Sequence, residues 1–572
     1  MSTTPAPASY TQFACVGTGF SGIALGATLK RWYGIGDIRF FERHADLGGT
    51  WFVNQYPGCA CDIPSALYSF SFEPNPDWSR VMSLRGEIWQ YLHDVADKYS
   101  LIEKMRFGVD VERCEWSEER GRWRLTARRR GGTGEVSHHE CQFLFAATGQ
   151  LTQPRETDVP GAASFKGRIL HSSRWDGSVD VEGRRVVVFG NGCTASQIVP
   201  AIVARTEHLT QVVRSKHWVL PPPADSENGA VVAARLFRYV PWAATLQRFL
   251  VFARAESALR GFYMTRAGGE YRRAARAEAE RYMRQTAPAK YYDKLIPDFE
   301  LGCKRRIFDG GYLESLHSEK LTLLDEPVQE IVPEGIRTRD GVVEADVIVM
   351  ANGFVTNNPV GGLDVIGRGG ETIEEHWESF GGPEAYNCTI ANGFPNFFIL
   401  LGPNSLTGHN SAIIAAENSV NFALRIIEPL LDGKGTAVEV TREAEQRYVD
   451  RMQRDMEKTV WLTGCTNWYL KDTKDGGKWN GSTYPYSQAY FWYRCLFPDF
   501  KDLQISGPTH RGRGRRHTFP KVALVAIVGY ILSIVFGLSR NPLAGGRYWQ
   551  RLRAGLQILQ KGVLEKLARR LE

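Results

Sequence analysis

The segment QFACVGTGFSG, residues 12–22, joins a short apolar run to a glycine-rich turn. The apolar run is typical of a buried strand, and Leu25, Leu29 and Trp32 after the turn recur at helical spacing. Residues 38–42, IRFFE, then predict a second strand. Strand, glycine turn, helix and strand in this order form a βαβ unit, the arrangement in which dinucleotides bind.

Three glycines shape this turn, and an acidic residue ends the second strand. Gly17 allows the tight turn, Gly19 lets the backbone approach a pyrophosphate, and Gly22 allows the helix to pack closely on the strand. Glu42 follows Gly22 by 20 residues, where a carboxylate accepts hydrogen bonds from ribose hydroxyls and repels a 2′-phosphate. A glycine turn alone is a weak signal, but this context predicts a site for FAD or NAD.

A second glycine turn follows the strand predicted over Arg185–Phe189 and precedes a helical pattern through Ile198 and Ile202. The next predicted strand, residues 209–213, ends in two cations that suit the 2′-phosphate of NADP, although a solvated strand end would look the same. An acidic and a basic site in one chain predict FAD together with NADPH. The residues expected at the second site are Gly190, Asn191, Gly192, Cys193, Thr194, Ala195, Arg214, Ser215 and the neighbouring Lys216.

The order of these units predicts one nucleotide-binding domain inserted in another. Residues 101–149 favour a β-meander, 226–300 a mostly helical insertion, Val347–Met350 a buried strand and 411–460 further helices. The expected fold class is α/β, with two Rossmann-like domains, the second inserted in the first, and a C-terminal apolar and basic tail. The expected boundaries are 1–155 and 351–507 for the FAD-binding domain, 156–225 and 301–350 for the NADP-binding domain, 226–300 for the insertion and 508–572 for the tail.

The positive charge of the chain is concentrated in its tail. The 572 residues carry a net charge of +7, but residues 508–572 hold 13 Lys and Arg against two acidic residues, or +11, which leaves −4 for the rest. A nucleic-acid-binding body would carry its basic excess in the fold itself, so nucleic acid is not expected as a partner.

Ten cysteines occur without the spacing of a zinc site, and no metal is expected. The N-terminal sequence lacks the basic start and apolar run of a secretory signal. These features predict an intracellular, reducing location in which the thiols are free.

Residues 165–176, FKGRILHSSRWD, carry the most specific pattern in the chain. They resemble the fingerprint F-x-G-x-x-x-H-x-x-x-W-P/D of the Baeyer–Villiger monooxygenases, a group within the flavin-dependent class B monooxygenases. The resemblance spans residues 10–500 and implies an NADPH-dependent flavoenzyme. The residues that meet the fingerprint are Phe165, Gly167, His171, Trp175 and Asp176. His171 and Trp175 are expected to join domains and support NADP binding, and for Trp175 core packing is an equal alternative.

Further segments resemble the family's cofactor sites. Residues 48–51 with 56–62 resemble its flavin-covering segment, 402–411 its segment near the flavin ring, and 464–469 a loop beside the nicotinamide. The turns 147–149 and 351–354 resemble those that close the FAD domain. The resemblance adds Thr50, Trp51, Asp62 and Tyr68 to the expected FAD residues and Cys61, Lys304 and Trp468 to the NADP residues.

The resemblance also implies a mechanism and its catalytic residues. NADPH reduces FAD, O2 adds to the flavin, and the resulting peroxide attacks a ketone, which rearranges to an ester or lactone. Arg305, in the segment Gly302–Arg306, matches the family's catalytic arginine, whose fixed charge would stabilise the negative peroxide and the oxyanion. Asp62 would orient that arginine, because an unpaired buried arginine is costly. Taken alone, a run of charges such as Lys304 to Arg306 is more often a solvated part of the surface than a catalytic site.

Some positions depart from the family pattern. Gln55 stands where arginine is common, Arg214-Ser215-Lys216 replaces Arg-Thr-Pro, and Asn352 replaces threonine. They leave the details of NADPH contacts open.

Three other functions stay open at this point. They are an N- or S-oxygenating flavin monooxygenase, an NADPH-dependent reductase, and a membrane-associated nucleotide-binding regulatory protein without oxygenase activity. Trp175, Asp62 and Arg305 disfavour the first, and the lack of a Cys-x-x-Cys pair disfavours the second.

The tail contains 17 uncharged residues, 522–538, between the basic residues 511–516 and 540–553. As a helix they would span about 26 Å, slightly less than a hydrocarbon core of about 30 Å. A membrane span, a helix in one leaflet and a helix at a subunit interface are all consistent with this pattern. The interpretation we favour is membrane attachment, with the catalytic body in the cytosol and a sizeable apolar ketone as substrate.

Overall fold

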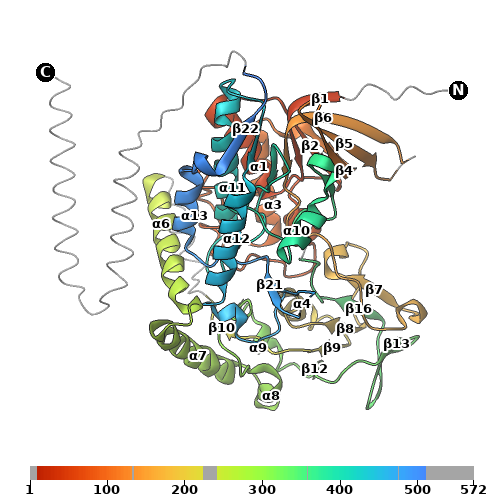
Figure 1. The fold of residues 1–572 in the computed structure, drawn as a ribbon. Coiled ribbons are helices and arrows are strands. Elements are labelled where there is room, and N and C mark those ends of the chain that lie inside the picture. The colour runs from red at the N-terminus through yellow and green to blue at the C-terminus, as the bar shows by residue number, and fades with distance from the viewer. Residues whose placement is uncertain (1–8, 132–133, 223–240, 357, 475, 510–572) are drawn as a thin grey trace. The chain divides into compact units, whose positions relative to one another are not determined.

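The computed structural model describes residues 9–131, 134–222, 241–356, 358–474 and 476–509 (Figure 1). All of these described residues belong to one compact unit. The predicted apolar segment 522–538 and the basic run 511–516 lie outside the described residues. Residues 226–240, the first part of the predicted insertion, also lie outside them. Among the described residues, no helix is both long and apolar enough to cross a bilayer.

The first sheet has eight strands and contains the first glycine turn. Its order is β17-β4-β5-β6-β1-β2-β3, with β18 paired to β6. β1 runs parallel to β2 and β6, whereas β4, β5 and β6 form an antiparallel meander. The strands are β1 (Ser9–Val16), β2 (Ile38–Glu42), β3 (Met105–Phe107), β4 (Val109–Ser117), β5 (Arg122–Arg129), β6 (Val136–Ala146), β17 (Asp364–Ile366) and β18 (Phe397–Ile399).

The second sheet has five parallel strands and contains the second glycine turn. Its order is β12-β9-β8-β16-β7. The two sheets occupy opposite ends of the body, the first at the top and the second at the bottom of Figure 1. The strands are β7 (Arg168–His171), β8 (Arg185–Phe189), β9 (His208–Val212), β12 (Leu321–Leu324) and β16 (Val347–Met350).

Three strand pairs and one three-stranded sheet lie outside the two main sheets in the described structure. They are β10 (Val219–Leu220) with β11 (Ile307–Phe308), β13 (Glu330–Val332) with β14 (Gly335–Thr338) and β15 (Gly341–Glu344), β19 (Ala437–Val440) with β22 (Leu503–Ser506), and β20 (Leu470–Asp472) with β21 (Lys478–Asn480).

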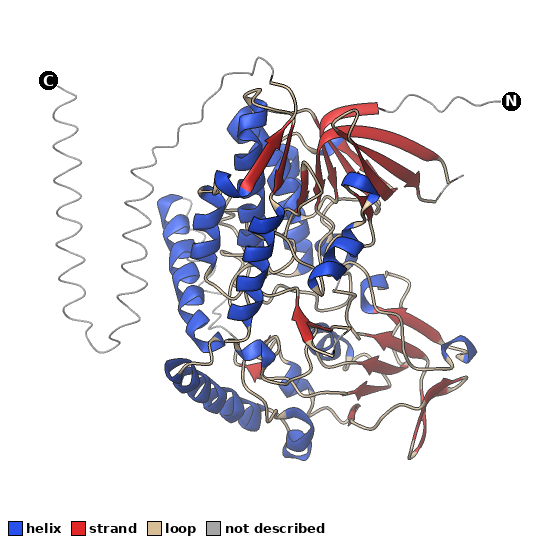
Figure 2. Ribbon diagram, in the orientation of Figure 1, coloured by secondary structure: helices blue, strands red, loops and turns tan. Residues whose placement is uncertain are grey.

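Helices gather on one side of the body (Figure 2). α1 packs on α11, and α11 packs in turn on α13. The longer helices are α1 (Phe20–Tyr33), α3 (Arg85–Lys98), α4 (Cys193–Ile202), α6 (Pro241–Ser257), α7 (Arg266–Thr286), α10 (Ile373–Phe380), α11 (Ala412–Leu431), α12 (Arg442–Met456) and α13 (Gln488–Leu496). The four-residue helices are α2 (Thr50–Val53), α8 (Tyr292–Leu295) and α9 (Tyr312–Ser315).

The α/β class with two Rossmann-like sheets, the second inserted in the sequence of the first, is confirmed. The strands predicted at Ile38–Glu42, Arg185–Phe189 and Val347–Met350 have those bounds in the structure. The helices predicted over 411–460 are interrupted by strand β19, because Ala437–Val440 pairs with residues 503–506 from far along the chain.

Candidate active site

The first glycine turn borders a pocket with about 900 Å³ of open space. Gly17 has φ +108°, and a Cβ there would lie 2.4 Å from the carbonyl oxygen of Ala147, so only glycine fits. Helix α1 begins after Gly19 with no side-chain cap and no acidic residue in its first turn, which leaves its N–H groups to bind an anion. The predicted FAD residues that line the pocket are Gly17, Gly19, Glu42, Thr50, Trp51 and Tyr68.

Glu42 is buried at the end of β2 and is held by the glycine turn itself. It accepts hydrogen bonds from the Thr18 backbone nitrogen at 3.0 Å and the Thr18 hydroxyl at 2.9 Å. Its other oxygen accepts from the His44 backbone nitrogen at 3.0 Å. The carboxylate is thereby fixed at the wall of the pocket.

Two predicted FAD residues do not line this pocket. Gly22 packs helix α1 on the turn, since a Cβ there would lie 2.3 Å from the Gly17 carbonyl oxygen. Asp62 instead makes a bidentate pair with Arg305 across 243 residues of sequence. Arg305 Nε lies 2.8 Å from Asp62 Oδ2, and Nη2 lies 2.7 Å from Oδ1.

The Asp62–Arg305 pair keeps the guanidinium charged and oriented. Asp62 is the first cause that raises the pKa of Arg305 above its ordinary value, against the opposing effect of burial. The side chains are 34% and 25% exposed, so the pair is accessible rather than sealed in the core. A fixed, accessible cation of this kind can stabilise negative charge that develops on a reacting oxygen.

The second glycine turn repeats the geometry of the first. Gly190 has φ +109°, and a Cβ there would lie 2.5 Å from the carbonyl oxygen of Ala351. Helix α4 also begins without a side-chain cap or an acidic first turn. Asn191 donates to the Ser215 carbonyl at 2.6 Å, which joins the turn to the end of β9. The structure thus brings the predicted NADP residues of the two segments together.

Two of the predicted cations also meet at this end of the second sheet. Lys304 Nζ lies 3.4 Å from the Lys216 carbonyl and 4.9 Å from the centre of the Phe299 ring. Burial lowers the pKa of Lys304, and the positive charge of Arg214 lowers it further. Arg214 is 81% exposed, and its nearest carboxylate in the described structure is Asp158 at 3.9 Å. These cations can therefore bind an added anion.

The segment around residues 56–62 docks on helix α4. Tyr56 donates to Gln197 Oε1 at 3.0 Å, and Gln197 donates to the Ala60 carbonyl at 3.0 Å. Cys61 is buried, and burial raises its pKa. The charge of Asp62 raises this pKa further and the charge of Arg305 lowers it, and both charges act in the same directions on the pKa of Cys193, the first residue of α4. The predicted Cys61, Asp62, Cys193 and Arg305 are therefore close neighbours.

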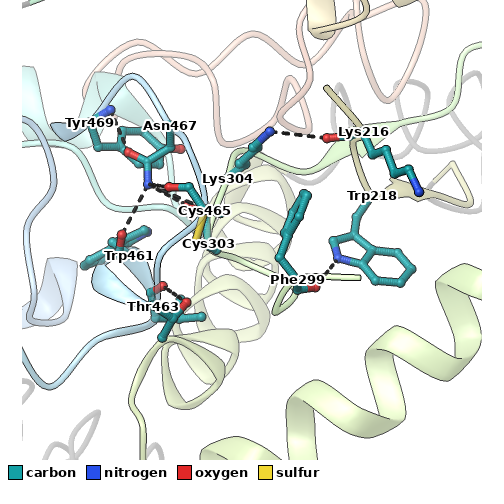
Figure 3. Close-up of a disulfide and its surroundings, with 11 residues drawn as sticks. Lys216, Trp218, Phe299, Cys303, Lys304, Trp461, Thr463, Cys465, Asn467 and Tyr469 are labelled. Carbon is teal, nitrogen blue, oxygen red and sulfur yellow. Dashed lines mark hydrogen bonds between the residues drawn. A yellow bond between two sulfur atoms is a disulfide. The ribbon is translucent and has the colours of Figure 1, made fainter. Parts of the chain in front are cut away.

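A disulfide joins Cys303 to Cys465, with Cα atoms 6.2 Å apart (Figure 3). The expectation that all thiols are free is therefore wrong for this pair, whereas the other eight cysteines are free. The two cysteines are 162 residues apart, so no spacing rule could pair them, and only the fold brings them within bonding distance. Cys303 directly precedes Lys304 and Arg305.

The loop that carries Cys465 is also held by hydrogen bonds (Figure 3). Asn467 donates from Nδ2 to the carbonyls of Cys303 and Trp461, both at 3.2 Å, and accepts from the Tyr469 backbone nitrogen at 3.0 Å. The predicted Trp468 lies 4.4 Å from the Tyr469 ring. The disulfide and Asn467 together fasten this loop to the segment that carries Arg305.

The fingerprint residues lie at the edge of the second sheet. His171, at the end of β7, donates from Nε2 to the Gly353 carbonyl at 3.0 Å, and its Nδ1 accepts from the Ser173 hydroxyl at 2.8 Å. Trp175 is 7% exposed and belongs to the main core. Asp176 pairs with Arg168 at 3.3 Å on the surface. The remaining fingerprint residues support packing: Phe165 contacts the core of the second sheet, and a Cβ on Gly167 would lie 2.3 Å from the Asp346 carbonyl.

A separate buried cluster joins helices α10 and α12. His376 Nε2 lies 3.1 Å from Glu384 and 3.2 Å from Glu445. Burial alone would lower the pKa of His376, but the two carboxylates raise it to about 9. None of the three lines the glycine-turn pocket, and the arrangement is that of a shared ion pair in the core.

Sequence reasoning missed several residues that build the site. Gln197 was not singled out in the sequence. Cys303, Cys465 and Asn467 lie in segments that resemble the family, but no role was predicted for them, because their contacts cross more than 130 residues of sequence. Cys303 could have been noticed only through its position beside Lys304.

Comparisons with known proteins agree on one family. A family model described as Flavin-binding monooxygenase-like matches residues 11–239. A Baeyer–Villiger monooxygenase of Pseudomonas aeruginosa is 34% identical over 471 residues, which cover 82% of this chain and 86% of that protein. A Baeyer–Villiger monooxygenase of Streptomyces coelicolor is 35% identical, covering 87% and 93%. The crystal structure of OTEMO in complex with FAD and NADP matches 88% of this chain and all of that one, with a TM-score of 0.74 and 24% identity.

Proposed function

Because this chain belongs to the Baeyer–Villiger monooxygenases within the flavin-binding monooxygenase-like family, we propose that it uses FAD, NADPH and O2 to insert one oxygen atom beside a ketone carbonyl. The product is an ester or a lactone. The observation that carries this proposal is the bidentate pair of Asp62 and Arg305, which fixes an accessible cation that can stabilise negative charge on a reacting oxygen. The relatives also disfavour the N- or S-oxygenating alternative.

FAD fits the pocket at the first glycine turn. The uncapped N-terminus of α1 suits its pyrophosphate, and Glu42 suits the ribose hydroxyls. Thr50, Trp51 and Tyr68 would hold the remainder of the cofactor. We assign the first sheet, within 1–155 and 351–507, to FAD and the second, within 156–225 and 301–350, to NADP, with 226–300 as the helical insertion. FAD bound there and reduced by NADPH would supply the redox chemistry that activates O2, one atom of which enters the product while the other leaves as water.

The chain's own residues position and stabilise the reacting atoms. Arg305 keeps its charge at any physiological pH, so it can hold the ketone oxygen as it becomes negative. Asp62 fixes the direction of the guanidinium and balances its charge when substrate is absent. The disulfide and Asn467 fasten the loop of residues 465–469 to the segment that carries Arg305, which helps to hold that arginine in place.

The proposed NADP site lies at the carboxyl ends of the parallel strands β8 and β9. The uncapped N-terminus of α4 suits the pyrophosphate, and Lys304 and Arg214 suit the 2′-phosphate. Trp468 and Cys61 border the nicotinamide side in this proposal.

The substrate we propose is a ketone with a sizeable apolar body. An apolar cluster surrounds Cys303 beside the arginine segment and includes Phe262, Val460, Trp461 and Tyr469. These side chains are buried against one another, and the apolar surroundings that they give the arginine segment would favour the alkyl part of a ketone over a small polar one.

The direct test is turnover of a ketone panel with NADPH and O2, with products identified by mass. The purified protein should be yellow, with one non-covalent FAD per chain. Ester or lactone carrying one oxygen atom from labelled O2 supports the proposal. A folded protein that cannot be loaded with FAD, or a loaded one that yields only hydrogen peroxide with every ketone, refutes it.

Replacing Lys304 or Arg214 by alanine should raise the KM for NADPH about ten- to a hundred-fold, because each removes a charge-assisted contact of roughly 1.5–3 kcal/mol. The KM for NADH should change less than about twofold, since NADH has no 2′-phosphate. Steady-state kinetics with both cofactors measure the difference. Lys166→Ala, at an exposed position paired only with Glu334, is the control. Equal effects on NADPH and NADH would contradict the assignment.

We also propose that residues 508–572 attach the protein to a membrane, with the body in the cytosol. The support is the sequence alone: 17 uncharged residues between basic flanks, with Tyr548 and Trp549 suited to the interface. The full chain should sediment with membranes and require detergent, and a chain ending at Gly507 should be soluble and bind FAD. A full chain that stays soluble as a discrete oligomer would identify residues 522–538 as an interface segment instead.

A further inference from the structure

Arg306 follows the catalytic arginine but has different surroundings. Its Nη2 lies 3.5 Å from the Gly408 carbonyl, a long contact, and its guanidinium carbon lies 5.6 Å from the centre of the Phe262 ring. The side chain is half-buried. Within the described part of the chain, no carboxylate lies within 4.0 Å of it.

Two arginines of the interior have carboxylate partners: Arg272 pairs with Glu300 at 2.6 Å, and Arg248 faces Glu417 at 3.9 Å. Half-buried arginines that have none within 4.0 Å in the described structure include Arg85, Arg425 and Arg494. Arg306 differs from these three in directly following Arg305. Burial lowers the pKa of Arg306, and the neighbouring charge of Arg305 lowers it further. A guanidinium that loses water without gaining an anion is costly, so its retention suggests that a ligand supplies the missing charge.

The contacts of Arg306 place it where three segments of the site meet. Phe262 comes from the helical insertion, and Gly408 comes from the loop 402–411. A Cβ on Gly408 would lie 2.5 Å from the Phe262 ring, so glycine is needed for this approach. The loop is rigid here because Glu256 accepts from His409 at 2.9 Å and from Asn410 at 2.8 Å.

We propose that Arg306 binds a carboxylate on the substrate, so that the enzyme's ketone is amphipathic, an apolar chain with a carboxylate away from the carbonyl that reacts. This inference rests on the proposed function, because it takes Arg305 as the reaction centre and Arg306 as its neighbour. The planar guanidinium matches a carboxylate with two parallel hydrogen bonds. The rings of Phe262 and Trp461, with centroids 5.1 Å apart, are buried against each other and give Arg306 an apolar neighbourhood that suits the chain of such a ligand.

The test compares three probes: a medium-chain methyl ketone that ends in a carboxylate, its methyl ester, and the plain alkanone of equal length. With the FAD-loaded wild type, the carboxylate should have the lowest KM. Arg306→Ala should raise that KM about ten- to a hundred-fold, the range of one charge-assisted contact. The kcat and the KM for the two neutral ketones should change less than about twofold. Arg306→Lys should restore part of the preference.

A second measurement does not depend on turnover. Binding of the same probes to the oxidised holoenzyme, followed through the flavin absorption spectrum, should show the same preference for the carboxylate and its loss in Arg306→Ala. If the preference is present but no ketone is oxygenated, the proposed function fails and the role of Arg306 stands. Arg266→Ala, at a side chain 95% exposed, is the control.

Two results would overturn the proposal. The first is equal affinity of the wild type for the carboxylate and its ester. The second is a rise in the KM for NADPH in Arg306→Ala with every ketone, which would assign Arg306 to a phosphate of the cofactor.

Discussion

Arg305→Ala should lose about 10²- to 10³-fold in the rate of ester formation, the loss seen when a donor to a developing oxyanion is removed. The variant should still bind FAD, because Arg305 does not line the pocket at the first glycine turn. NADPH should still bleach the flavin, and O2 should be returned as hydrogen peroxide rather than inserted. Flavin absorbance, NADPH consumption and ester yield, measured on one sample, separate these steps.

The partner of Arg305 provides the matched comparison. Asp62→Asn keeps the shape but removes the charge that raises the pKa of Arg305 and orients its guanidinium. Its ester yield per NADPH should lie between those of the wild type and Arg305→Ala, and Asp62→Ala should also slow flavin reduction. Ester formation within about tenfold of wild type in Arg305→Ala would remove that residue from the mechanism.

The double variant Cys303→Ser with Cys465→Ser should lower both stability and coupling. The bridge closes a loop of 162 residues, and such a cross-link contributes roughly 2–5 kcal/mol in the chain-entropy description. We expect a lower melting temperature and a smaller yield of ester per NADPH, because Cys303 no longer fastens the Arg305 segment to the loop of Asn467 and Tyr469. Calorimetry and product analysis measure the two effects.

A reducing agent is the control for this variant. In the wild type, the reducing agent should lower the melting temperature and the yield of ester per NADPH to the values of the double variant. In the double variant, it should change neither quantity. Thiol titration after denaturation should count eight thiols in the untreated wild type. Ten thiols in a fully coupled enzyme would show that the bridge has no role in catalysis.

The sequence by itself determined the nucleotide-binding architecture and the family. Strand, glycine turn and helix are local patterns: Gly17 and Gly190 are needed because the backbone turns with φ above +100° at both positions. Apolar runs such as Arg185–Phe189 and Val347–Met350 read as buried strands because both faces of a parallel sheet are covered. The family motifs likewise lie within short segments, which is why they could be read without a structure.

Only the tertiary structure decided which distant side chains meet. The Gln197 contacts with Tyr56 and Ala60 and the Cys303–Cys465 bridge join segments more than 130 residues apart. The family resemblance implied that Asp62 pairs with Arg305, but the bidentate geometry of that pair comes from the fold. Helical and strand periodicity describe which way a side chain faces within its own element, and carry no information about which other element packs against that face. For the same reason the sequence could not show that Arg306 lacks a carboxylate partner, because Lys304, Arg305 and Arg306 are simply three adjacent cations there. The fold distinguishes two of them, since it places the Asp62 carboxylate beside Arg305 and the Gly408 carbonyl beside Arg306.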